Sequence, residues 1–402
     1  MEEAPTHQVG FAVENREAGY FIHRQTYGLK MKALLQKACS MSRSFIVMLM
    51  YAVAAFCVLH IFMLNNGWFR ELSDSGFSFD RMISFTADRP FAYRVLMPAL
   101  INAGAFLFSK DFIHLHKKWL TESSPLARYA KNKLFMQEDM ALKVHLEYFY
   151  LYISLIFLLY AVRAITQNIY AFPSVFSDVT PAIGLLFLPL TFTWGGHIYD
   201  FPELLLMALC LLCIIKKKWL LYYPLFCFAI LNKEVNVLLI LFFMAFSLGT
   251  MAKKDLLKHV VGHVLIGASL VLWVRYLFAG NPHIPGLHDY WKQNILFWMN
   301  PKSYFLFWDA YHVGVPISPR GSNILLLAFT AFFVFYKWED KPREIKRLFI
   351  YTTTCMTPLY LYGGWADEIR TLSLMFPAIY LLGVYSFYRL IYTHKLPTGD
   401  DL

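Results

Sequence analysis

The sequence predicts an all-α polytopic membrane protein with about ten transmembrane helices plus one re-entrant or broken segment. Hydrophobic residues make up 58% of the 402 residues and charged residues only 16%, whereas a soluble domain carries roughly 25% charged residues. Mean hydropathy is +0.45. Long apolar runs recur along the chain and are separated by polar or charged stretches. These observations exclude an ordinary soluble protein.

The first apolar run, residues 44–64, is long enough to cross a bilayer. Residues 1–43 are polar and end in basic side chains, so we expect a cytoplasmic basic tail joined to an uncleaved first span. The transmembrane domain is expected to cover residues 44–392, and residues 393–402 to form a cytoplasmic C-terminal tail. No Asn-x-Ser/Thr sequon occurs, which favours a bacterial inner membrane.

Further apolar segments follow the first, and several are shorter than the usual span of about twenty residues. They lie at residues 91–109, 144–166, 175–194, 199–215, 219–231, 235–250, 259–279, 323–336, 348–362 and 371–392. We expect outer loops at residues 65–90 and 280–322, and a cytoplasmic loop rich in Lys and Arg at residues 110–143.

The number of spans between two basic loops indicates which apolar segment does not cross the membrane. The loop 110–143 and the basic turn 216–218 should both face the cytoplasm, yet three apolar segments separate them. Segment 175–194 contains Pro181 and Pro189, so we predict that it is the re-entrant one. Both termini then lie in the cytoplasm together with most of the Lys and Arg residues. The net charge of +10 therefore reflects membrane topology and not a nucleic-acid partner.

Ionisable residues gather at the non-cytoplasmic ends of the predicted spans. The groups comprise residues 74–94, His197 with Asp200 and Glu203, Lys233 with Glu234, the loop 281–323, and Asp367 with Glu368 and Arg370. Most of them sit at the ends of short apolar helices, where ionisable groups are costly unless they are hydrated or paired. We therefore expect a water-filled cavity that opens away from the cytoplasm and is lined by these residues.

Each of these side chains also has a structural explanation. The alternatives are a Lys233–Glu234 ion pair, a Glu368–Arg370 ion pair, helix capping by Asp200, snorkelling of Arg94 to the headgroups, and a hydrogen-bonded structural role for His197. No single residue decides between structure and function. The convergence of the groups on one face favours function.

The outer loop 281–323 is rich in aromatic and basic side chains, among them Trp291 and Lys292. It suits either a platform resting on the membrane or a wall that holds a phosphorylated lipid and a sugar. The histidines of this loop lack a zinc-binding spacing, so no metal site is predicted.

Motifs of soluble nucleotide-dependent enzymes are missing from the sequence. It contains no phosphate-binding glycine loop, no GxSxG elbow and no dinucleotide fingerprint. A site on the outer face would have no nucleotide pool, so an activated donor would arrive attached to a lipid. No cofactor is predicted.

Short motifs at the outer face resemble those of the GT-C superfamily, the polytopic glycosyltransferases that use polyprenyl-phosphate sugars. Residues 90–98 read PFAYRVLMP and match a PFxYRxLxP motif of a bacterial inner-membrane group. Residues 200–204 read DFPEL, Lys233–Glu234 occupies a hairpin tip, and an E-x-R element precedes the last helix. The resemblance in topology covers most of residues 44–392.

The resemblance implies inverting transfer of a sugar from a polyprenyl-phosphate carrier to an acceptor hydroxyl of a glycan, lipid or protein, with a first-loop aspartate as general base. Asp80 is the first choice because of its distance from the PFxYR motif, and Asp88 is the second because Arg89 could hold it as a structural pair. Arg94, Lys233 and Arg370 would stabilise the leaving phosphate, and Glu234, Asp200 and Glu368 would orient those cations or hold sugar hydroxyls.

Two other classes fit the same composition. A lipid-linked glycan flippase or transporter would explain buried charges, but it predicts related half-helices in two internal repeats, which the sequence does not contain. A surface-glycan polymerase or ligase is a closer chemical relative that usually carries a larger outer loop than residues 281–323.

Overall fold

The computed structural model describes residues 41–63, 76–123, 140–191, 196–284, 290–309 and 317–392. The chain divides into two compact units, Met1–Val53 and Ala54–Leu402. The first unit contributes the beginning of the helix Met41–Met63, and the remaining structure belongs to the second unit. Residues 1–40 of the predicted N-terminal tail, the predicted C-terminal tail, and parts of the predicted loops 65–90, 110–143 and 280–322 lie outside the described residues.

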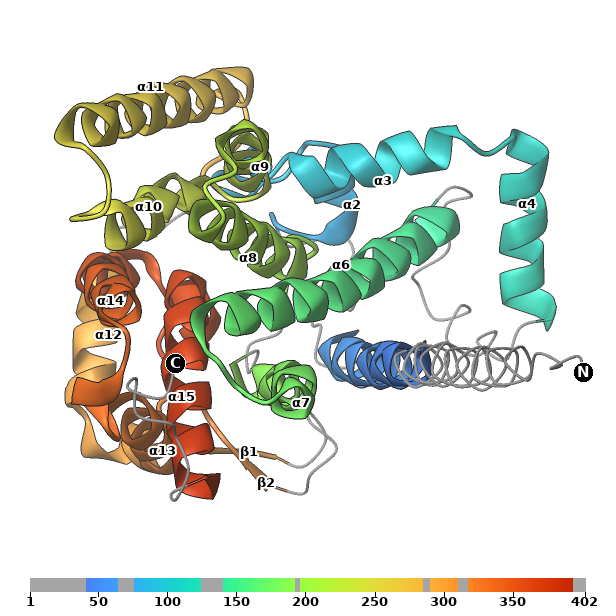
Figure 1. The fold of residues 1–402 in the computed structure, drawn as a ribbon. Helices are drawn as coiled ribbons and strands as arrows, with labels where there is room; N and C mark the ends of the chain where they lie inside the picture. The colour runs from blue at the N-terminus through green and yellow to red at the C-terminus, as the bar shows by residue number, and fades with distance from the viewer. Residues whose placement is uncertain are drawn as a thin grey trace, which may run out of the picture. The chain divides into compact units, whose positions relative to one another are not determined.

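The described residues of the second unit are almost wholly helical (Figure 1). The α-helices are α2 (Phe79–Ile83), α3 (Leu96–Phe106), α4 (Lys110–Lys118), α6 (Met140–Ile169), α7 (Ser174–Leu186), α8 (Asp200–Ile215), α9 (Trp219–Asn232), α10 (Ile240–Ser247), α11 (Lys253–Leu277), α12 (Tyr290–Met299), α13 (Ile324–Phe335), α14 (Arg343–Gly363) and α15 (Phe376–Ile391). Shorter turns of helix are η2 (Phe91–Tyr93), η3 (Trp119–Ser123), η4 (Leu188–Thr191), η5 (Glu234–Leu239), η7 (Pro301–Phe305), η8 (Trp338–Asp340) and η9 (Ile369–Met375). Two three-residue strands, β1 (Phe307–Asp309) and β2 (Ile317–Pro319), pair antiparallel.

Local sequence explains where the helices around the site begin and end. α8 starts at Asp200 with a proline in its first turn, where an acidic side chain and a proline are both favourable. It ends before Lys217, whose positive φ of 53° places the backbone in the left-handed region. The chain then turns directly into α9, and α8 and α9 pack against each other.

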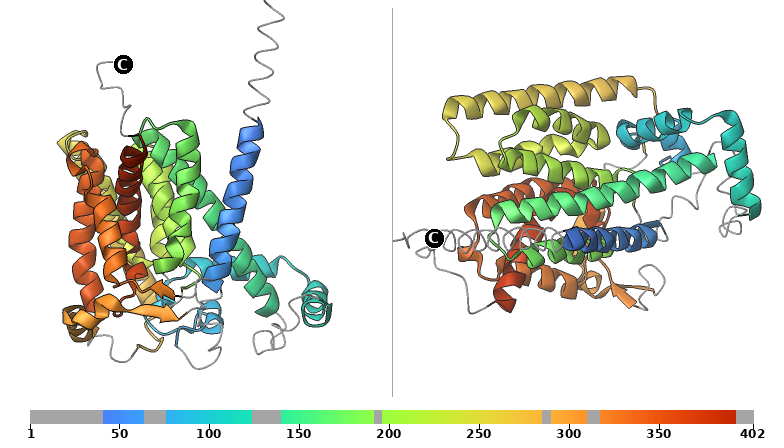
Figure 2. Two further views of the ribbon diagram at one scale, coloured as in Figure 1. Left: turned by 90° about the horizontal axis from the view of Figure 1, so that it is seen from below. Right: turned by 45° about the vertical axis from the view of Figure 1, so that its right-hand side comes forward.

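Apolar helix faces hold the second unit together. α6 packs against α8, α7 and α3, while α10 packs on α14 and α13 on α15 (Figure 1). Figure 2 shows these helices side by side, with β1 and β2 at the end of the molecule that also carries α2. The loops that join the helices at this end bring distant parts of the sequence together.

Five helices are long and apolar enough to cross a membrane, judged by length and composition within the described residues. They are Met41–Met63, Met140–Ile169, Ser174–Thr191, Lys253–Leu277 and Ile369–Ile391. Shorter apolar helices lie at Trp219–Asn232, Glu234–Ser247 and Ile324–Phe335. The predicted class, a helical membrane protein, agrees with this architecture.

The position of the broken segment differs from the sequence prediction. Residues 175–194 were expected to be re-entrant, yet Ser174–Thr191 is long and apolar enough to be a span, because the helix continues through Pro181. The predicted span 91–109 contains the short turn η2 and the helix α3, which is followed by a bend of 100° into α4. A sharp bend between helices therefore occurs at a place where the prolines of 175–194 did not suggest one.

One apolar cluster joins segments from the first predicted loop to the middle of the chain. Its buried members include Phe79 of α2, Met97 of α3, Val144 of α6 and Tyr199 just before α8. The first turns of α6 thus lie at the same end of the molecule as α2. This end also carries the charged residues described next.

Candidate functional site

Arg94 and Tyr199 form the centre of a cluster of charged side chains. The Arg94 guanidinium lies 4.2 Å from the Tyr199 ring centroid and 4.5 Å from that of Phe91. Its Nη1 also donates a hydrogen bond to the Tyr199 hydroxyl. Only 11% of the Arg94 side chain is exposed, so it does not snorkel to a membrane surface. The last residue of the PFAYR segment, Arg94, therefore places its guanidinium in the protein interior.

Lys233 is held by Glu203 rather than by its neighbour Glu234. The Lys233 Nζ lies 2.7 Å from Glu203 Oε2, and the other carboxylate oxygen accepts a hydrogen bond from the Ser373 hydroxyl at 2.7 Å. Both members of the ion pair are buried. The ammonium also lies 5.6 Å from the Tyr199 ring centroid. The hairpin tip thus points inward, and the expected Lys233–Glu234 pair is not formed.

Arg370 joins the last helix to the beginning of α8. It donates to Asp200 Oδ2 at 2.8 Å and to the Glu368 carboxylate through both Nε and Nη2. Asp200 Oδ2 also accepts the backbone N–H of His197 at 2.7 Å. Asp200 therefore fixes the turn before α8 instead of capping the N–H groups of α8 itself.

Glu234 is the least constrained acid of the cluster. Its Oε2 faces Arg94 Nε at 3.7 Å, too far for a hydrogen bond, and neither buried atom has a hydrogen-bond partner among the described residues. The Glu234 side chain is 28% exposed, and with Tyr93 and Arg275 it lines a cavity of about 10 Å³, the size of one water molecule. Arg94 and Glu234 therefore retain capacity to bind a ligand.

His197 is buried among aromatic rings at the edge of the same cluster. Its ring packs on Phe77, Phe91 and Tyr199, with centroid distances of 5.9, 5.0 and 5.1 Å. Burial, followed by the positive charges of Arg370, Arg94 and Lys233, lowers the His197 pKa well below its usual value. The imidazole is therefore neutral at physiological pH, and its Nδ1 has no hydrogen-bond partner.

We call this group the Tyr199 cluster. Its members come from separate stretches of the chain and are Arg94, His197, Tyr199, Asp200, Glu203, Lys233, Glu234, Glu368 and Arg370. Three cations and four carboxylates meet at the ends of apolar helices, as the sequence predicted. Such a concentration of charge is costly in an apolar setting unless the groups are paired or hydrated, and buried charge clusters of this kind are common at binding and catalytic sites.

The aspartates of the first loop lie outside the ion-pair network of the Tyr199 cluster. The Asp80 carboxylate accepts a hydrogen bond from Ser78 at 2.5 Å and forms no ion pair with a described residue. Its neighbour Phe79 belongs to the apolar cluster that includes Tyr199. The helix that carries Asp80 is therefore attached to the same apolar cluster as Tyr199.

Asp88 pairs with a different arginine from the one expected. Its Oδ1 lies 3.6 Å from Arg81 Nη1, whereas the expected partner Arg89 makes backbone hydrogen bonds with Pro282 and Ile284. Arg89 and His283 form an isolated parallel β-bridge between the two backbones. The Arg89 Nε is buried without a hydrogen-bond partner among the described residues.

Trp291 and Lys292 are not brought into the Tyr199 cluster. They lie on α12 and contact each other, with Lys292 Nζ 5.6 Å from the Trp291 ring centroid, and 41% of Trp291 is exposed. α12 itself is fixed by the buried Asn294, whose amide donates to backbone carbonyls at the end of α14 and accepts the N–H of Ala366 at 2.8 Å. Trp291 and Lys292 thus lie on a firmly attached outer helix.

A second buried contact attaches the outer loop to the last helices. Arg320 donates two hydrogen bonds of 2.7 Å to Asp367, whose side chain is fully buried. This bidentate geometry is the strongest form of the Arg–carboxylate pair. It holds the segment before η9, and therefore Glu368 and Arg370, in place.

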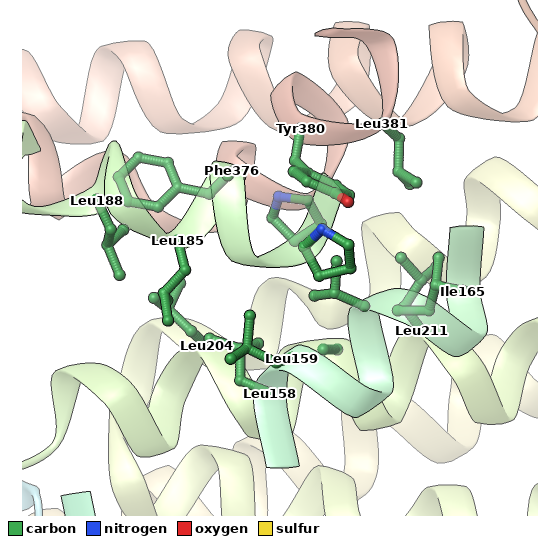
Figure 3. A pocket seen from close by; sticks show the side chains of 15 residues that line it. Leu158, Leu159, Ile165, Leu185, Leu188, Leu204, Leu211, Phe376, Tyr380 and Leu381 are labelled. Atoms are coloured by element: carbon green, nitrogen blue, oxygen red, sulfur yellow. The ribbon is translucent and has the colours of Figure 1, made fainter. Parts of the chain in front are cut away.

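An apolar cavity of about 110 Å³ lies beside the Tyr199 cluster between α6, α7, α8 and α15 (Figure 3). Leu159, Leu185, Leu204 and Phe376 are among the residues that line it. Leu204 directly follows Glu203 in the chain, and Phe376 lies three residues after Ser373. Two residues that line the cavity are therefore close in the chain to the buried Lys233–Glu203–Ser373 contact.

Sequence reasoning missed several residues that organise the site. Tyr199, Ser373 and Asn294 were not singled out, since an isolated polar residue in an apolar run carries no spacing signal. Tyr199 lies one residue before the DFPEL element, which was the nearest available signal. The Arg320–Asp367 pair joins residues far apart in the chain and has no local pattern.

Comparison of the chain with protein-family models, with curated proteins and with solved structures finds no match. Within the described residues, no group of three or more His, Cys, Asp or Glu side chains is arranged to hold a metal ion. The chemistry of the site therefore has to be inferred from the Tyr199 cluster and from the surfaces that adjoin it.

Proposed function

We propose that the protein is a membrane glycosyltransferase of the GT-C type that moves a sugar from a polyprenyl-phosphate carrier to an acceptor hydroxyl, with inversion. The observation that supports this most directly is the convergence of Arg94, Lys233 and Arg370 beside an apolar cavity. A lipid phosphate needs both a cationic site for its headgroup and an apolar surface for its chain.

One cation of the Tyr199 cluster supports an anionic ligand, although the cluster as a whole holds three cations and four carboxylates. Glu203 neutralises Lys233, and Asp200 with Glu368 neutralises Arg370, whereas Arg94 faces Glu234 only at 3.7 Å. Arg94 is consequently the cation with the greatest capacity to bind a phosphate oxygen, and its planar guanidinium suits a bidentate contact. Lys233 and Arg370 belong to the same cluster but are already paired with carboxylates.

In the proposed reaction, Asp80 takes the proton of the acceptor hydroxyl while that oxygen forms a bond to the anomeric carbon. The bond between this carbon and the phosphate oxygen breaks, and its electron pair leaves with the lipid phosphate. General-base catalysis of this kind contributes roughly 10²–10⁴-fold to the rate. Arg94 stabilises the charge that develops on the leaving phosphate, and Asp88 is the alternative base.

The finer topology is also part of the proposal. About ten helices would cross the membrane, with the longer candidates joined by α8, α9, α10, α13 and α14. Both termini would lie in the cytoplasm, and the Tyr199 cluster would face the periplasm of a bacterial inner membrane. Membrane lipids would surround the helices. No metal is required by the proposed mechanism.

Sugar transfer by the purified protein in lipid nanodiscs tests the proposal. A radiolabelled polyprenyl-phosphate sugar would be offered with candidate glycan, lipid and protein acceptors, and products would be separated by chromatography. Asp80→Asn should reduce turnover by about 10²–10⁴-fold. Asp255→Asn is the matched control, because Asp255 is an exposed acid paired with Lys258 on α11 and should retain activity.

Three results would contradict the proposal in different ways. Wild-type turnover by Asp80→Asn would eliminate Asp80 as the base and direct attention to Asp88. Movement of the labelled lipid between leaflets of a proteoliposome, without sugar transfer to any acceptor, would identify a flippase instead of a transferase. Successive addition of sugar repeats would identify a polymerase.

A further inference from the structure

α3 and α4 form a sharply bent elbow. The two helices meet at 100°, and Ser109 caps α4 by accepting the backbone N–H of Phe112 at 3.2 Å. α3 contains 11 residues and is therefore about 16 Å long, roughly half of the thickness of a bilayer core. The elbow cannot cross a membrane as one straight span.

The segments that precede and follow the elbow, α3 and the start of α6, contact the same apolar cluster. Met97 and Ile101 of α3 share an apolar cluster with Met140 of α6 and with Tyr199. Asn102 of α3 also donates a hydrogen bond to a backbone carbonyl of α2 at 2.8 Å. The chain therefore leaves the Tyr199 end through α3 and returns to that same end at the start of α6.

α4 has three distinct faces. The first face packs on α6, where His116 Nε2 and His145 Nδ1 lie 2.8 Å apart and Leu120 is buried with Ala141. The second face is an apolar stripe at helical spacing made of Phe108, Phe112, Leu115 and Trp119, all of which are exposed. The third face is polar and carries Lys110, Asp111, His114, Lys117 and Lys118.

We propose that the elbow lies in the headgroup layer of the leaflet next to the Tyr199 cluster, with the apolar stripe turned to the acyl chains and the lysines of α4 turned to lipid phosphates. Residues 110–118 then face the same side of the membrane as the Tyr199 cluster, not the cytoplasm that the sequence pattern suggested. This inference does not depend on the proposed sugar transfer.

The chemistry of the elbow identifies a lipid surface as its partner. The stripe continues into Phe106 and Leu107, which are 90% and 82% exposed, so apolar surface runs unbroken from α3 to α4. An amphipathic helix with basic side chains beside an exposed aromatic and aliphatic stripe is suited to the boundary between acyl chains and anionic headgroups. Figure 2 (left view) shows α4 at the end of the molecule that carries β1 and β2.

Side-specific cysteine labelling tests the position of α4. The full chain without its six native cysteines would carry one new cysteine, from Asp111→Cys, Lys302→Cys or Lys254→Cys. Lys302 lies in η7, between α12 and β1, and β1 is at the end of the molecule that carries α2. Lys254 begins α11, whose other end brings Arg275 to within 5.9 Å of the Tyr93 ring. In intact cells and after permeabilisation, a membrane-impermeant maleimide should label Asp111→Cys in the same fractions as Lys302→Cys, and Lys254→Cys only from the opposite side.

Spin labels on α4 test its contact with lipid in vesicles of phosphatidylethanolamine and phosphatidylglycerol. A label at Leu115→Cys should be accessible to oxygen and protected from a water-soluble nickel chelate, whereas a label at Lys118→Cys should show the reverse. Labelling of Asp111→Cys from the Lys254 side would overturn the proposal. So would a Leu115 label that is open to the nickel chelate, as in water, or closed to both reagents, as under a partner protein.

Discussion

Two polar clusters of this molecule are buried between apolar helices, but they differ in how completely their atoms are paired. Between α9 and α11, the hydroxyl of Tyr222 lies 2.6 Å from His263 Nε2, and His263 Nδ1 lies 2.6 Å from the carbonyl oxygen of His259. In the Tyr199 cluster, Arg94 Nε and Glu234 Oε2 find no hydrogen-bond partner within the described part of the chain. The polar atoms of Tyr222 and His263 are thus hydrogen-bonded to protein groups, whereas Arg94 and Glu234 can still form hydrogen bonds with a ligand.

Buried cations at the two ends of the second unit also differ in the groups that they contact. Lys341, between α13 and α14, donates to the carbonyl oxygens of Phe333 and Val334 at 3.0 and 2.6 Å. Burial lowers its pKa to about 8. This lysine satisfies the last turn of a helix and uses no carboxylate, so it supports structure. Arg94, by contrast, is stacked on aromatic rings and held loosely by Glu234, which leaves it available for an anion.

The largest expected effect follows from removing one member of a buried pair. Lys233→Met should leave Glu203 as an uncompensated buried carboxylate and lower the free energy of unfolding by about 3–5 kcal/mol. Lys258→Met, which breaks an exposed pair with Asp255, should cost less than about 1 kcal/mol. Chemical denaturation of the detergent-solubilised variants would measure both.

A double variant separates stability from function at this pair. Lys233→Met combined with Glu203→Leu replaces the ion pair by apolar side chains and should recover most of the lost free energy of unfolding. Sugar transfer should nevertheless stay below the wild-type rate, because the positive potential of Lys233 is absent. Full recovery of both quantities would show that the pair is only structural.

Arg94→Gln should affect activity more than stability. Loss of a preorganised charge at the leaving phosphate should lower kcat by about 10²–10³-fold. The stability loss should be smaller than that of Lys233→Met, because Glu234 is 28% exposed and can be hydrated when Arg94 is removed. Arg94→Lys, which keeps the charge but loses the planar fork, should recover part of the rate. Unchanged kcat in Arg94→Gln would contradict the assignment.

The contrast between these regions also explains what the sequence could predict. The helical membrane class follows from composition and apolar runs, which depend only on the chain itself. The gathering of Arg94, Lys233 and Arg370 at one end was also predictable, because each residue lies at the end of an apolar segment. Their individual partners were not, because Glu203 and Asp200 lie far from them in the chain and helix packing alone selects such pairs.

Local charge patterns misled where neighbours in sequence are not neighbours in space. Lys233 and Glu234 are adjacent, yet the backbone at Lys233 is extended, with φ at −160°. The Lys233 side chain pairs with Glu203, whereas the Glu234 side chain faces Arg94. Likewise, the prolines of residues 175–194 suggested a break, although the chain bends between α3 and α4 instead. Both α3 and α4 pack against α6, a long-range contact that leaves no proline signature in the sequence.

The buried neutral histidine of the Tyr199 cluster should make stability sensitive to acid. His197 has a lowered pKa in the folded protein, while the unfolded chain titrates near the usual value of about 6.5. Below that pH the unfolded state binds a proton that the folded state does not, so stability falls as pH falls. Between pH 7 and pH 5 the wild type should lose up to about 2 kcal/mol more than His197→Gln. Equal pH dependence of unfolding in the two proteins would mean that His197 takes up a proton as readily in the folded state as in the unfolded state, which would contradict the lowered pKa.

The smallest effect is expected at the saturated cluster. Tyr222→Phe removes the hydroxyl that lies 2.6 Å from His263 Nε2 and should cost about 1 kcal/mol of unfolding free energy without changing sugar transfer. Replacing both members, in Tyr222→Phe with His263→Leu, should restore much of that loss, because no polar atom is then left unpaired. A double-mutant cycle on the free energy of unfolding measures the coupling of Tyr222 and His263, and kcat measured in parallel shows whether this pair affects sugar transfer. If Tyr222→Phe lowered kcat as strongly as Arg94→Gln, saturation of hydrogen bonds would not distinguish a structural cluster from a functional one.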